Sequence, residues 1–162
     1  MTGDSSPGGP KTGGDGVWVL WIDGGARGNP GPAGAGAALY NPAGKRVAAK
    51  AFPFGVATNN AAEYEALIRG LELARAAGAR RIEVRSDSEL LVRQMTGEYR
   101  VRAHHLQDAA ERAHGLLGAF AEARFTAIRR EANREADRLA NRAMDEVERS
   151  RDSRPGGGMV RS

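Results

Sequence analysis

Two aspartates follow apolar segments of the chain, at the points where buried strands would end. Asp23 comes directly after the segment VWVLWI, and Asp87 follows IEVRS. If these two strands are parallel neighbours, both carboxylates lie at one edge of a sheet, where sites form in α/β proteins. Taken singly, each residue has an ordinary alternative role, Asp23 as a turn former and Asp87 as a helix N-cap.

Two further acids lie on the apolar faces of expected helices. Glu63 is followed by apolar residues at i+4 and i+8, and Asp137 is followed by them at i+3 and i+7. The alternatives are that Glu63 interacts with the helix dipole and that Asp137 forms an ion pair with Arg134 or Arg138.

Carboxylates that converge in a buried place repel one another, and their pKa values rise. A hard divalent cation relieves this repulsion, and Mg²⁺ binds a few carboxylates while it keeps water or phosphate oxygens as its other ligands. The chain has no cysteine and only three histidines, so zinc is a poor fit. The four acids together therefore predict a magnesium site.

Other local features favour a nucleic-acid partner. The glycine-rich segment GGARGNPGPAGAG, which starts at Gly24, allows a backbone to approach a sugar–phosphate chain closely. Thr58, Asn59 and Asn60 stand at an expected helix N-terminus, where hydroxyl, amide and backbone N–H groups can bind a phosphate; ordinary N-capping by Thr58 is the alternative. All but three of the 24 basic residues are Arg, which suits phosphate binding, although compositional bias explains this equally well.

A chain of 162 residues with a formal net charge of +4 is sufficient for one folded domain. The absence of cysteine excludes a disulfide framework and a thiol nucleophile. Residues 1–16 and 150–162 are rich in Gly, Pro, Ser and charged residues, so we expect two disordered tails around a domain at 17–149. No apolar run approaches the roughly 18 residues of a membrane span, so we expect a cytoplasmic protein that does not interact with membranes.

Changes in apolar periodicity predict five strands and four helices in the order βββαβααβα. This order predicts an antiparallel meander continued by parallel strands, which gives a mixed five-stranded α/β sheet with helices on both faces. Residues 24–33 are expected to form a glycine-rich turn. The expected strands are 17–22, 34–40, 45–54, 81–85 and 125–128, and the expected helices are 58–77, 86–95, 103–122 and 132–148.

Four segments occur in the order and at the spacing of the type 1 ribonuclease H family, which the chain therefore resembles from residue 17 to about residue 148. They are DGGARGNPGPAG, TNNAAEYEAL, VRSDSELLVRQ and REANREADRLAN. Only GEYRVR, at residues 97–102, separates the second expected helix from the third. The resemblance is therefore greatest to the short bacterial and archaeal form, which lacks the basic protrusion of longer members.

The resemblance implies an enzyme that hydrolyses the RNA strand of an RNA–DNA hybrid with two Mg²⁺ or Mn²⁺ ions and leaves 5′-phosphate and 3′-hydroxyl ends. Asp23, Glu63, Asp87 and Asp137 match the metal-binding acids of the family, with Asp23 bridging both ions. Substrate contacts carried over from the resemblance are Gly24, Gly25, Asn29, Thr58, Asn59, Asn60 and Ser88, with Gln94 near a further contact. We expect a monomer with no obligate protein partner.

One segment departs from the family pattern. Many members carry a histidine between the last strand and the last helix, whereas residues 128–133 here read IRREAN. Glu131 and Arg130 are the charged groups that we expect to act there as auxiliary residues in product release. Two other readings remain open: a module on the same fold that binds hybrids without cutting them, and a metal nuclease that acts on DNA or double-stranded RNA.

Overall fold

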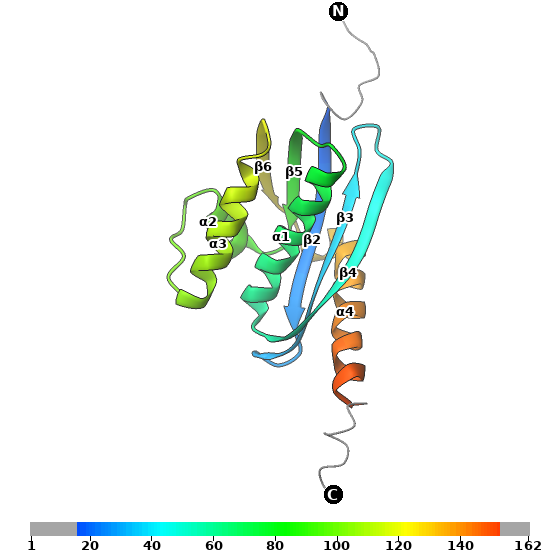
Figure 1. Cartoon of the computed structure of the whole chain (residues 1–162), viewed down its shortest axis with the longest axis vertical. Coiled ribbons are helices and arrows are strands. Elements are labelled where there is room, and N and C mark those ends of the chain that lie inside the picture. The colour runs from blue at the N-terminus through cyan, green and yellow to red at the C-terminus, as the bar shows by residue number, and fades with distance from the viewer. Residues whose placement is uncertain (1–15, 153–162) are drawn as a thin grey trace, which may run out of the picture.

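The computed structural model describes residues 16–152, and its elements follow the expected order βββαβααβα (Figure 1). The tails expected at 1–16 and 150–162 lie outside the described residues, apart from Gly16 and the segment 150–152, which continues the last helix. The strands are β2 (Val17–Ala26), β3 (Gly31–Tyr40), β4 (Arg46–Ala57), β5 (Arg81–Ser86) and β6 (Glu122–Ala127). The helices are α1 (Asn59–Ala76), α2 (Glu89–Met95), α3 (His104–Leu117), the 3₁₀ turn η1 (Arg130–Ala132) and α4 (Arg134–Asp152).

The five strands form one mixed sheet in the order β4-β3-β2-β5-β6. β4, β3 and β2 are antiparallel neighbours, and β2, β5 and β6 are parallel. The predicted fold class is therefore confirmed, and so is the parallel pairing on which the predicted site depends.

Helices cover both faces of this sheet (Figure 1). α1 packs on β2 and β3 and is itself covered by α3, while α4 packs on β2, β3 and β4 from the other side. On the α1 side, Leu20 and Ile22 of β2 are fully buried in one core cluster with Leu67 and Leu71 of α1. None of the described helices is long and apolar enough to cross a membrane.

The glycine-rich segment that we expected to be a turn is mostly strand. β2 continues to Ala26 and β3 begins at Gly31, so the turn itself is short. The glycines in these strands allow helices to approach the sheet closely: a Cβ on Gly24 would lie 2.2 Å from the Ala62 carbonyl oxygen of α1. A Cβ on Gly36 would lie 2.4 Å from the Ala136 carbonyl oxygen of α4. Both contacts lie next to residues of the predicted site.

Several other boundaries also differ from expectation, among them those of α2, α3 and β6. α2 begins at Glu89 with Ser88 as its N-cap, α3 ends at Leu117, and β6 begins at Glu122. β6 is an edge strand whose charged residues Glu122 and Arg124 are exposed, which explains why a segment as polar as EARFTA forms a strand. No helix separates α2 from α3, as the resemblance to the short form implied.

Candidate active site

The acidic residues lie at the end of the parallel pair β2–β5. The last pair of this ladder is Ile22 with Ser86, and the next residue on each strand is an acid, Asp23 or Asp87. α1 brings Glu63 to the same place, and one carboxylate oxygen from each of the three acids lies within 4.8 Å of the others. Three acids that are 24 to 64 residues apart in the chain thus form one cluster.

Asp137, in the first turn of α4, lies beside this cluster. It lines the same cleft as Asp23 and Glu63, and its carboxyl group contributes to the raised pKa of Asp23. It is not among the three residues whose oxygens lie within 4.8 Å of one another. The structure therefore brings all four predicted acids to one end of the sheet, three of them at ligand distance.

Three of the ordinary alternatives for these acids are not supported by the described residues. Ser88, not Asp87, caps α2, because its Oγ accepts a hydrogen bond from the Leu91 N–H. α1 has no acidic residue in its first turn, so Glu63 is not placed to interact with the helix dipole there. Arg138, proposed as an ion-pair partner of Asp137, pairs instead with Glu135.

Burial and like charge make the ionised cluster unfavourable. Burial, the charge of Asp87 and the carboxyl group of Asp137 raise the pKa of Asp23 to about 8. Burial and the charges of Asp23 and Asp87 raise the pKa of Glu63 to about 9, against a smaller opposite effect of Arg130. Glu63 Oε1 is buried and has no hydrogen-bond partner within the described part of the chain.

This arrangement fits a hard divalent cation. All the available ligand atoms are carboxylate oxygens, which Mg²⁺ and Mn²⁺ prefer. A bound cation would offset the repulsion between the charges and would provide a partner for Glu63 Oε1. Asp23, Glu63 and Asp87, with Asp137 beside them, are therefore the residues that could hold a metal.

Two of the three asparagines assigned to substrate binding connect the β2–β3 turn to α1. Asn29 Oδ1 accepts a hydrogen bond from the Asn59 N–H at 3.0 Å, and Asn59 Oδ1 accepts one from the Ala26 N–H at 2.8 Å. Gly25 lines the acidic cleft, and so does Gly24, whose missing Cβ also permits the contact with α1. These residues hold the turn in place beside the acids.

The remaining predicted contacts lie at helix N-termini, except Gln94, which lies near the end of α2. Thr58 Oγ1 accepts a hydrogen bond from the Ala61 N–H, which confirms it as the N-cap of α1, and it lies 3.4 Å from His105 Nε2. Asn60 is exposed at the edge of a groove that the α2–α3 connection also lines. Ser88 caps α2, as described above, and Gln94 Oε1 accepts a hydrogen bond from Tyr64.

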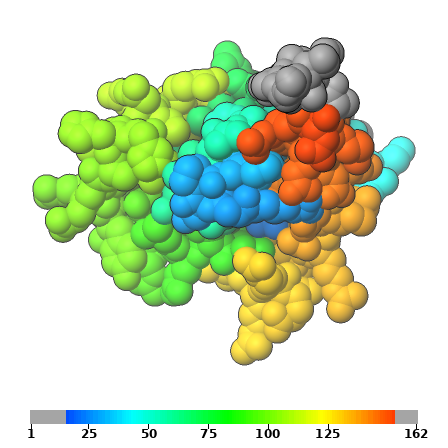
Figure 2. All heavy atoms as spheres, turned by 90° about the horizontal axis from the view of Figure 1, so that it is seen from below, coloured from blue at the N-terminus to red at the C-terminus, as the bar shows by residue number. Residues whose placement is uncertain are grey.

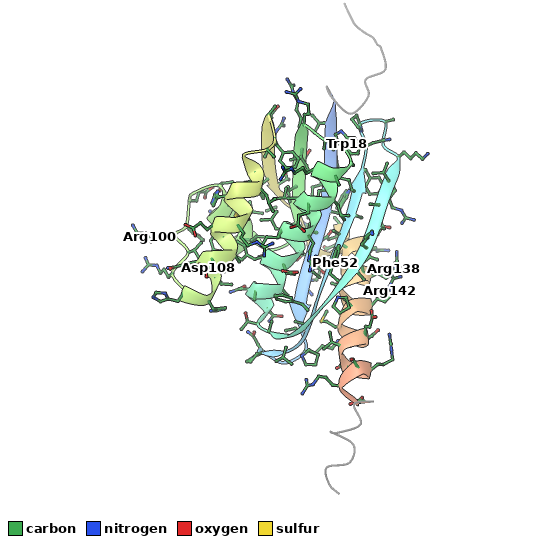
Figure 3. All side chains as sticks on the ribbon, viewed as in Figure 1. Trp18, Phe52, Arg100, Asp108, Arg138 and Arg142 are labelled. Carbon is green, nitrogen blue, oxygen red and sulfur yellow. The ribbon has the colours of Figure 1, made fainter. Side chains whose placement is uncertain are left out.

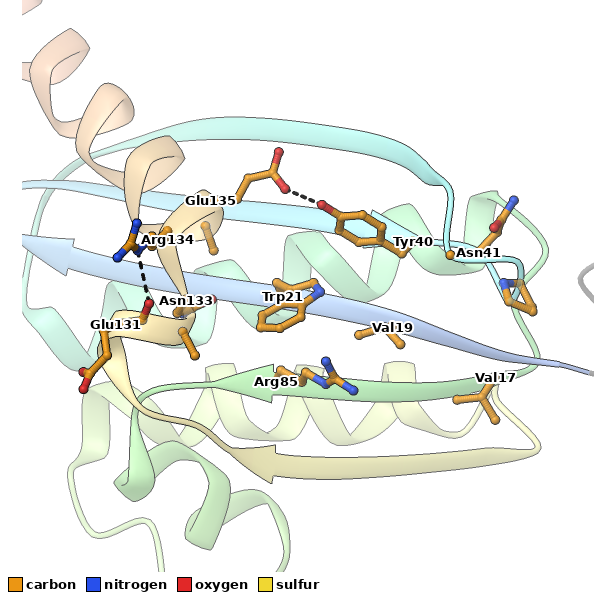
Figure 4. A pocket seen from close by; sticks show the side chains of 14 residues that line it. Val17, Val19, Trp21, Tyr40, Asn41, Arg85, Glu131, Asn133, Arg134 and Glu135 are labelled. Carbon is orange, nitrogen blue, oxygen red and sulfur yellow. Dashed lines mark hydrogen bonds between the residues drawn. The ribbon is translucent and has the colours of Figure 1, made fainter.

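The acidic cleft has a volume of about 410 Å³ and opens at the end of the molecule shown in Figure 2. In this view the β2–β3 turn, in blue, lies between α4, in orange to red, and the green α2–α3 region. Arg130 lines this cleft with the acids. Glu131 lines a different groove, of about 520 Å³, together with Trp21 and Tyr40 (Figure 4).

Sequence reasoning missed two residues that organise this site. Arg27 in the β2–β3 turn forms ion pairs with Asp145 and Glu148 of α4. Asn133, just before α4, is 1% exposed and hydrogen-bonds to Asp87. Asn133 belongs to the segment REANREADRLAN, but its role depends on a contact with β5 that the sequence alone does not show.

A five-stranded mixed sheet with clustered carboxylates at the end of its central parallel pair defines an α/β protein with an acidic site suited to divalent metals. The chain belongs to the reverse transcriptase-like family, whose model matches residues 22–143. Over 127 residues, 78% of this chain, it is 43% identical to ribonuclease HI from Halobacterium salinarum. It is 42% identical over 133 residues to the bifunctional protein Rv2228c from Mycobacterium tuberculosis. The chain spans 64% and 36% of the lengths of these two relatives.

Solved structures agree with these comparisons. The crystal structure of the halobacterial RNase H1 matches with a TM-score of 0.78 and 42% identity, over 81% of this chain and 99% of that one. The N-terminal RNase H domain of Rv2228c gives a TM-score of 0.81 at 40% identity, over 84% and 99% of the two chains. LC11-RNase H1, solved in complex with an RNA/DNA hybrid, gives 0.76 at 40% identity, over 81% and 99%. The resemblance to the type 1 ribonuclease H family is therefore confirmed.

Proposed function

We propose that this chain is a metal-dependent endoribonuclease that hydrolyses the RNA strand of RNA–DNA hybrids. The observation that carries the proposal is the cluster of Asp23, Glu63 and Asp87, whose oxygens lie within 4.8 Å of one another at the end of β2 and β5. Similarity to ribonucleases HI, one of them solved with an RNA/DNA hybrid, supports the hybrid as the substrate.

The three clustered acids and Asp137 would hold two Mg²⁺ ions, or Mn²⁺ in their place, with Asp23 contributing to both sites. When bound, such a pair activates a water for attack and stabilises the leaving oxygen, which gives 5′-phosphate and 3′-hydroxyl products. The protein contributes carboxylates that are fixed by strand ends and helix turns, so they need little rearrangement to bind the ions. Arg130, at the rim of the cleft, adds a positive charge where a phosphate would enter.

Hybrid recognition would come from the β2–β3 turn and the N-terminus of α1. Asn29 and Asn59 fix this turn, so its amide groups can contact 2′-hydroxyls, the feature that distinguishes RNA from DNA. Thr58 stands at the N-terminus of α1, where backbone N–H groups favour a phosphate of the DNA strand. Arg100 and Arg102 add positive charge to the groove that Asn60 lines, and Figure 3 shows Arg100 on the α2–α3 connection.

The test is a cleavage assay with the RNA or the DNA strand of a hybrid labelled, alongside double-stranded RNA and double-stranded DNA. We expect cuts only in the RNA of the hybrid, only with Mg²⁺ or Mn²⁺, and none with EDTA. Ligation of the products would show their 5′-phosphate and 3′-hydroxyl ends. Binding of the hybrid without cleavage would instead support a binding module, and equal cleavage of another duplex would support a different nuclease; either result contradicts the proposal.

We further propose that residues 17–149, extended by α4 to Asp152, form the catalytic domain and act as a monomer without an obligate protein partner. A cytoplasmic location remains a prediction from the sequence. Sedimentation of the full chain with and without a hybrid would test the monomer, because a dimer would be about twice its 17.2 kDa mass.

A further inference from the structure

Asn133 is a buried amide that contacts two of the strands and the helix that carry the acids. Its side chain is 1% exposed, and Figure 4 shows the residue on the segment that leads into α4. Its Nδ2 group donates one hydrogen bond to the Ile22 carbonyl of β2 at 2.8 Å and another to Asp87 Oδ2 at 3.1 Å. The backbone carbonyl oxygen of Asn133 accepts a hydrogen bond from the Asp137 N–H at 3.0 Å.

These bonds lie where the parallel β2–β5 ladder ends, although Asp23 is still paired with Gly36 of β3. The β2–β5 ladder ends at the pair of Ile22 with Ser86, so Asp23 and Asp87 are the first residues beyond it. Asn133 joins the backbone just before Asp23 to the carboxylate of Asp87. Its backbone carbonyl also accepts the Asp137 N–H, a hydrogen bond that stabilises the first turn of α4. One residue therefore connects the elements that hold three of the four acids.

The chemistry of the contact requires an uncharged group with two donors. The Nδ2 group has two hydrogens, one for each acceptor, and a short side chain with a single donor could satisfy only one of them. A carboxylate in this position would repel Asp87. A guanidinium or ammonium group would bring a positive charge to the place where a cation is needed.

The contact also opposes the repulsion within the cluster. Asp87 is only half-buried, and its negative charge raises the pKa values of Asp23 and Glu63. Without a bond to hold it, the Asp87 carboxylate would relieve this repulsion by rotating towards solvent. The Asn133 bond keeps it facing the other acids, while the remaining lone pairs of the carboxylate stay available to a cation.

Folding stability alone gives little reason for this arrangement. Asn133 Oδ1 is buried and has no hydrogen-bond partner within the described part of the chain. A buried, unsatisfied carbonyl oxygen is unfavourable, so the residue carries a penalty that a purely structural role would not require.

We propose that Asn133 is a positioning residue that holds Asp87 in the geometry needed to bind the metal. The inference rests on the proposed function, because it assigns a role to a residue that supports the same site. It predicts that loss of the amide weakens metal binding more than it weakens the fold.

The test compares Asn133→Ala and Asn133→Ser with Tyr40→Phe in the full chain. Tyr40→Phe is the matched control, because the Tyr40 hydroxyl donates a 2.7 Å hydrogen bond to Glu135 and likewise ties α4 to the sheet. Two readouts are needed: Mn²⁺ binding to the free protein, followed by the loss of the free Mn²⁺ signal in electron paramagnetic resonance, and the Mg²⁺ concentration for half-maximal cleavage.

We expect Asn133→Ala to weaken Mn²⁺ binding and to raise the half-saturating Mg²⁺ concentration by about 10- to 100-fold. Cleavage should recover substantially at saturating Mg²⁺. Asn133→Ser, which keeps one donor and is the milder change for folding, should show a smaller shift in the same direction. Tyr40→Phe should lower the melting temperature with unchanged metal binding.

If both Asn133 variants bind Mn²⁺ within twofold of the wild type, the inference is wrong and the residue serves the fold alone. The Mn²⁺-binding test of Asn133 can be decided independently of the proposed function. A wild-type protein that binds Mn²⁺ but cuts no hybrid would contradict the proposed function, and the Mn²⁺ comparison among the variants would still test the role of Asn133.

Discussion

Replacing Asp23 with Asn should abolish cleavage while making the metal-free protein more stable. Asp23 is 7% exposed and lies in contact with other acids, so its charge is unfavourable in the folded protein without a cation. The amide of Asn keeps the size and polarity of the side chain but carries no charge. The stability gain and the activity loss therefore have one cause.

The size of the stability gain follows from the pKa of Asp23, which is raised from 3.8 to about 8. Between these values the folded state binds more protons than the unfolded state, so metal-free stability falls as pH rises through this range. At neutral pH the ionisation penalty has an upper limit of about 4 kcal/mol, at 1.36 kcal/mol for each pKa unit. Relaxation of the surroundings reduces this to about 1 to 2 kcal/mol, which corresponds to a melting temperature about 3 to 8 °C higher.

The assay is thermal unfolding with EDTA across a pH series, and again with Mg²⁺. The gain should be near zero below about pH 4, where the carboxyl is protonated in both states, and greatest above about pH 8. Mg²⁺ should stabilise the wild type more than the variant. Asp108→Asn makes the same chemical change on the exposed surface of α3 and should alter stability by less than about 0.5 kcal/mol (Figure 3).

Two results would refute this reasoning. If Asp23→Asn is no more stable than the wild type above about pH 8 in EDTA, the Asp23 carboxylate of the wild type carries no uncompensated charge. Because metal stabilisation of the reaction is worth several kcal/mol, we expect cleavage to fall by about a thousandfold or more. A variant that keeps more than about a tenth of the wild-type rate would remove Asp23 from the site.

Three other predictions follow from the structure. Gly36→Ala places a Cβ 2.4 Å from the Ala136 carbonyl oxygen, so it should displace Asp137 and destabilise the fold by about 1 to 3 kcal/mol in denaturant unfolding. An unchanged free energy of unfolding would contradict the close packing of α4 on β3. If Glu131 assists product release, Glu131→Gln should lower steady-state turnover by about three- to thirtyfold while single-turnover cleavage stays unchanged. Because Glu131 lies outside the acidic cleft and Arg130 lines it, Arg130→Gln is the competing variant. The variant with the larger loss of steady-state turnover identifies the auxiliary residue. Hybrid affinity should fall with salt with a log–log slope of about −3 to −5, for about three to five phosphate contacts, and a slope steeper than about −8 would show a larger contact surface.

The acids could be found from the sequence because each one interrupts an apolar pattern. Asp23 and Asp87 directly follow segments with buried apolar residues, and Glu63 and Asp137 lie on the core-facing stripes of their helices. A charge in such a position needs a partner, so the anomaly is visible without coordinates. The order of strands and helices was then sufficient to predict that these residues meet.

The glycines show what the sequence could not reveal. A run of Gly, Ala and Pro has no alternation, so residues 24–33 resembled a turn, although most of the segment is paired strand. The function of Gly24 in this segment, and of Gly36 further along β3, is to leave space for the close approach of α1 and α4. That role exists only once the helices are in place, and nothing local in the sequence indicates it.

The positions of these close contacts explain why the acids converge. A Cβ on Gly24 would lie 2.7 Å from the Glu63 N–H nitrogen, and the obstruction at Gly36 would come from the carbonyl just before Asp137. Gly36 is also the pairing partner of Asp23 across β2 and β3. The two helices thus approach the sheet closely at the turns that carry Glu63 and Asp137. Both buried side-chain oxygens without partners within residues 16–152, on Glu63 and Asn133, lie at this same place. Unfavourable interactions of the metal-free fold are therefore concentrated where a bound cation would offset them.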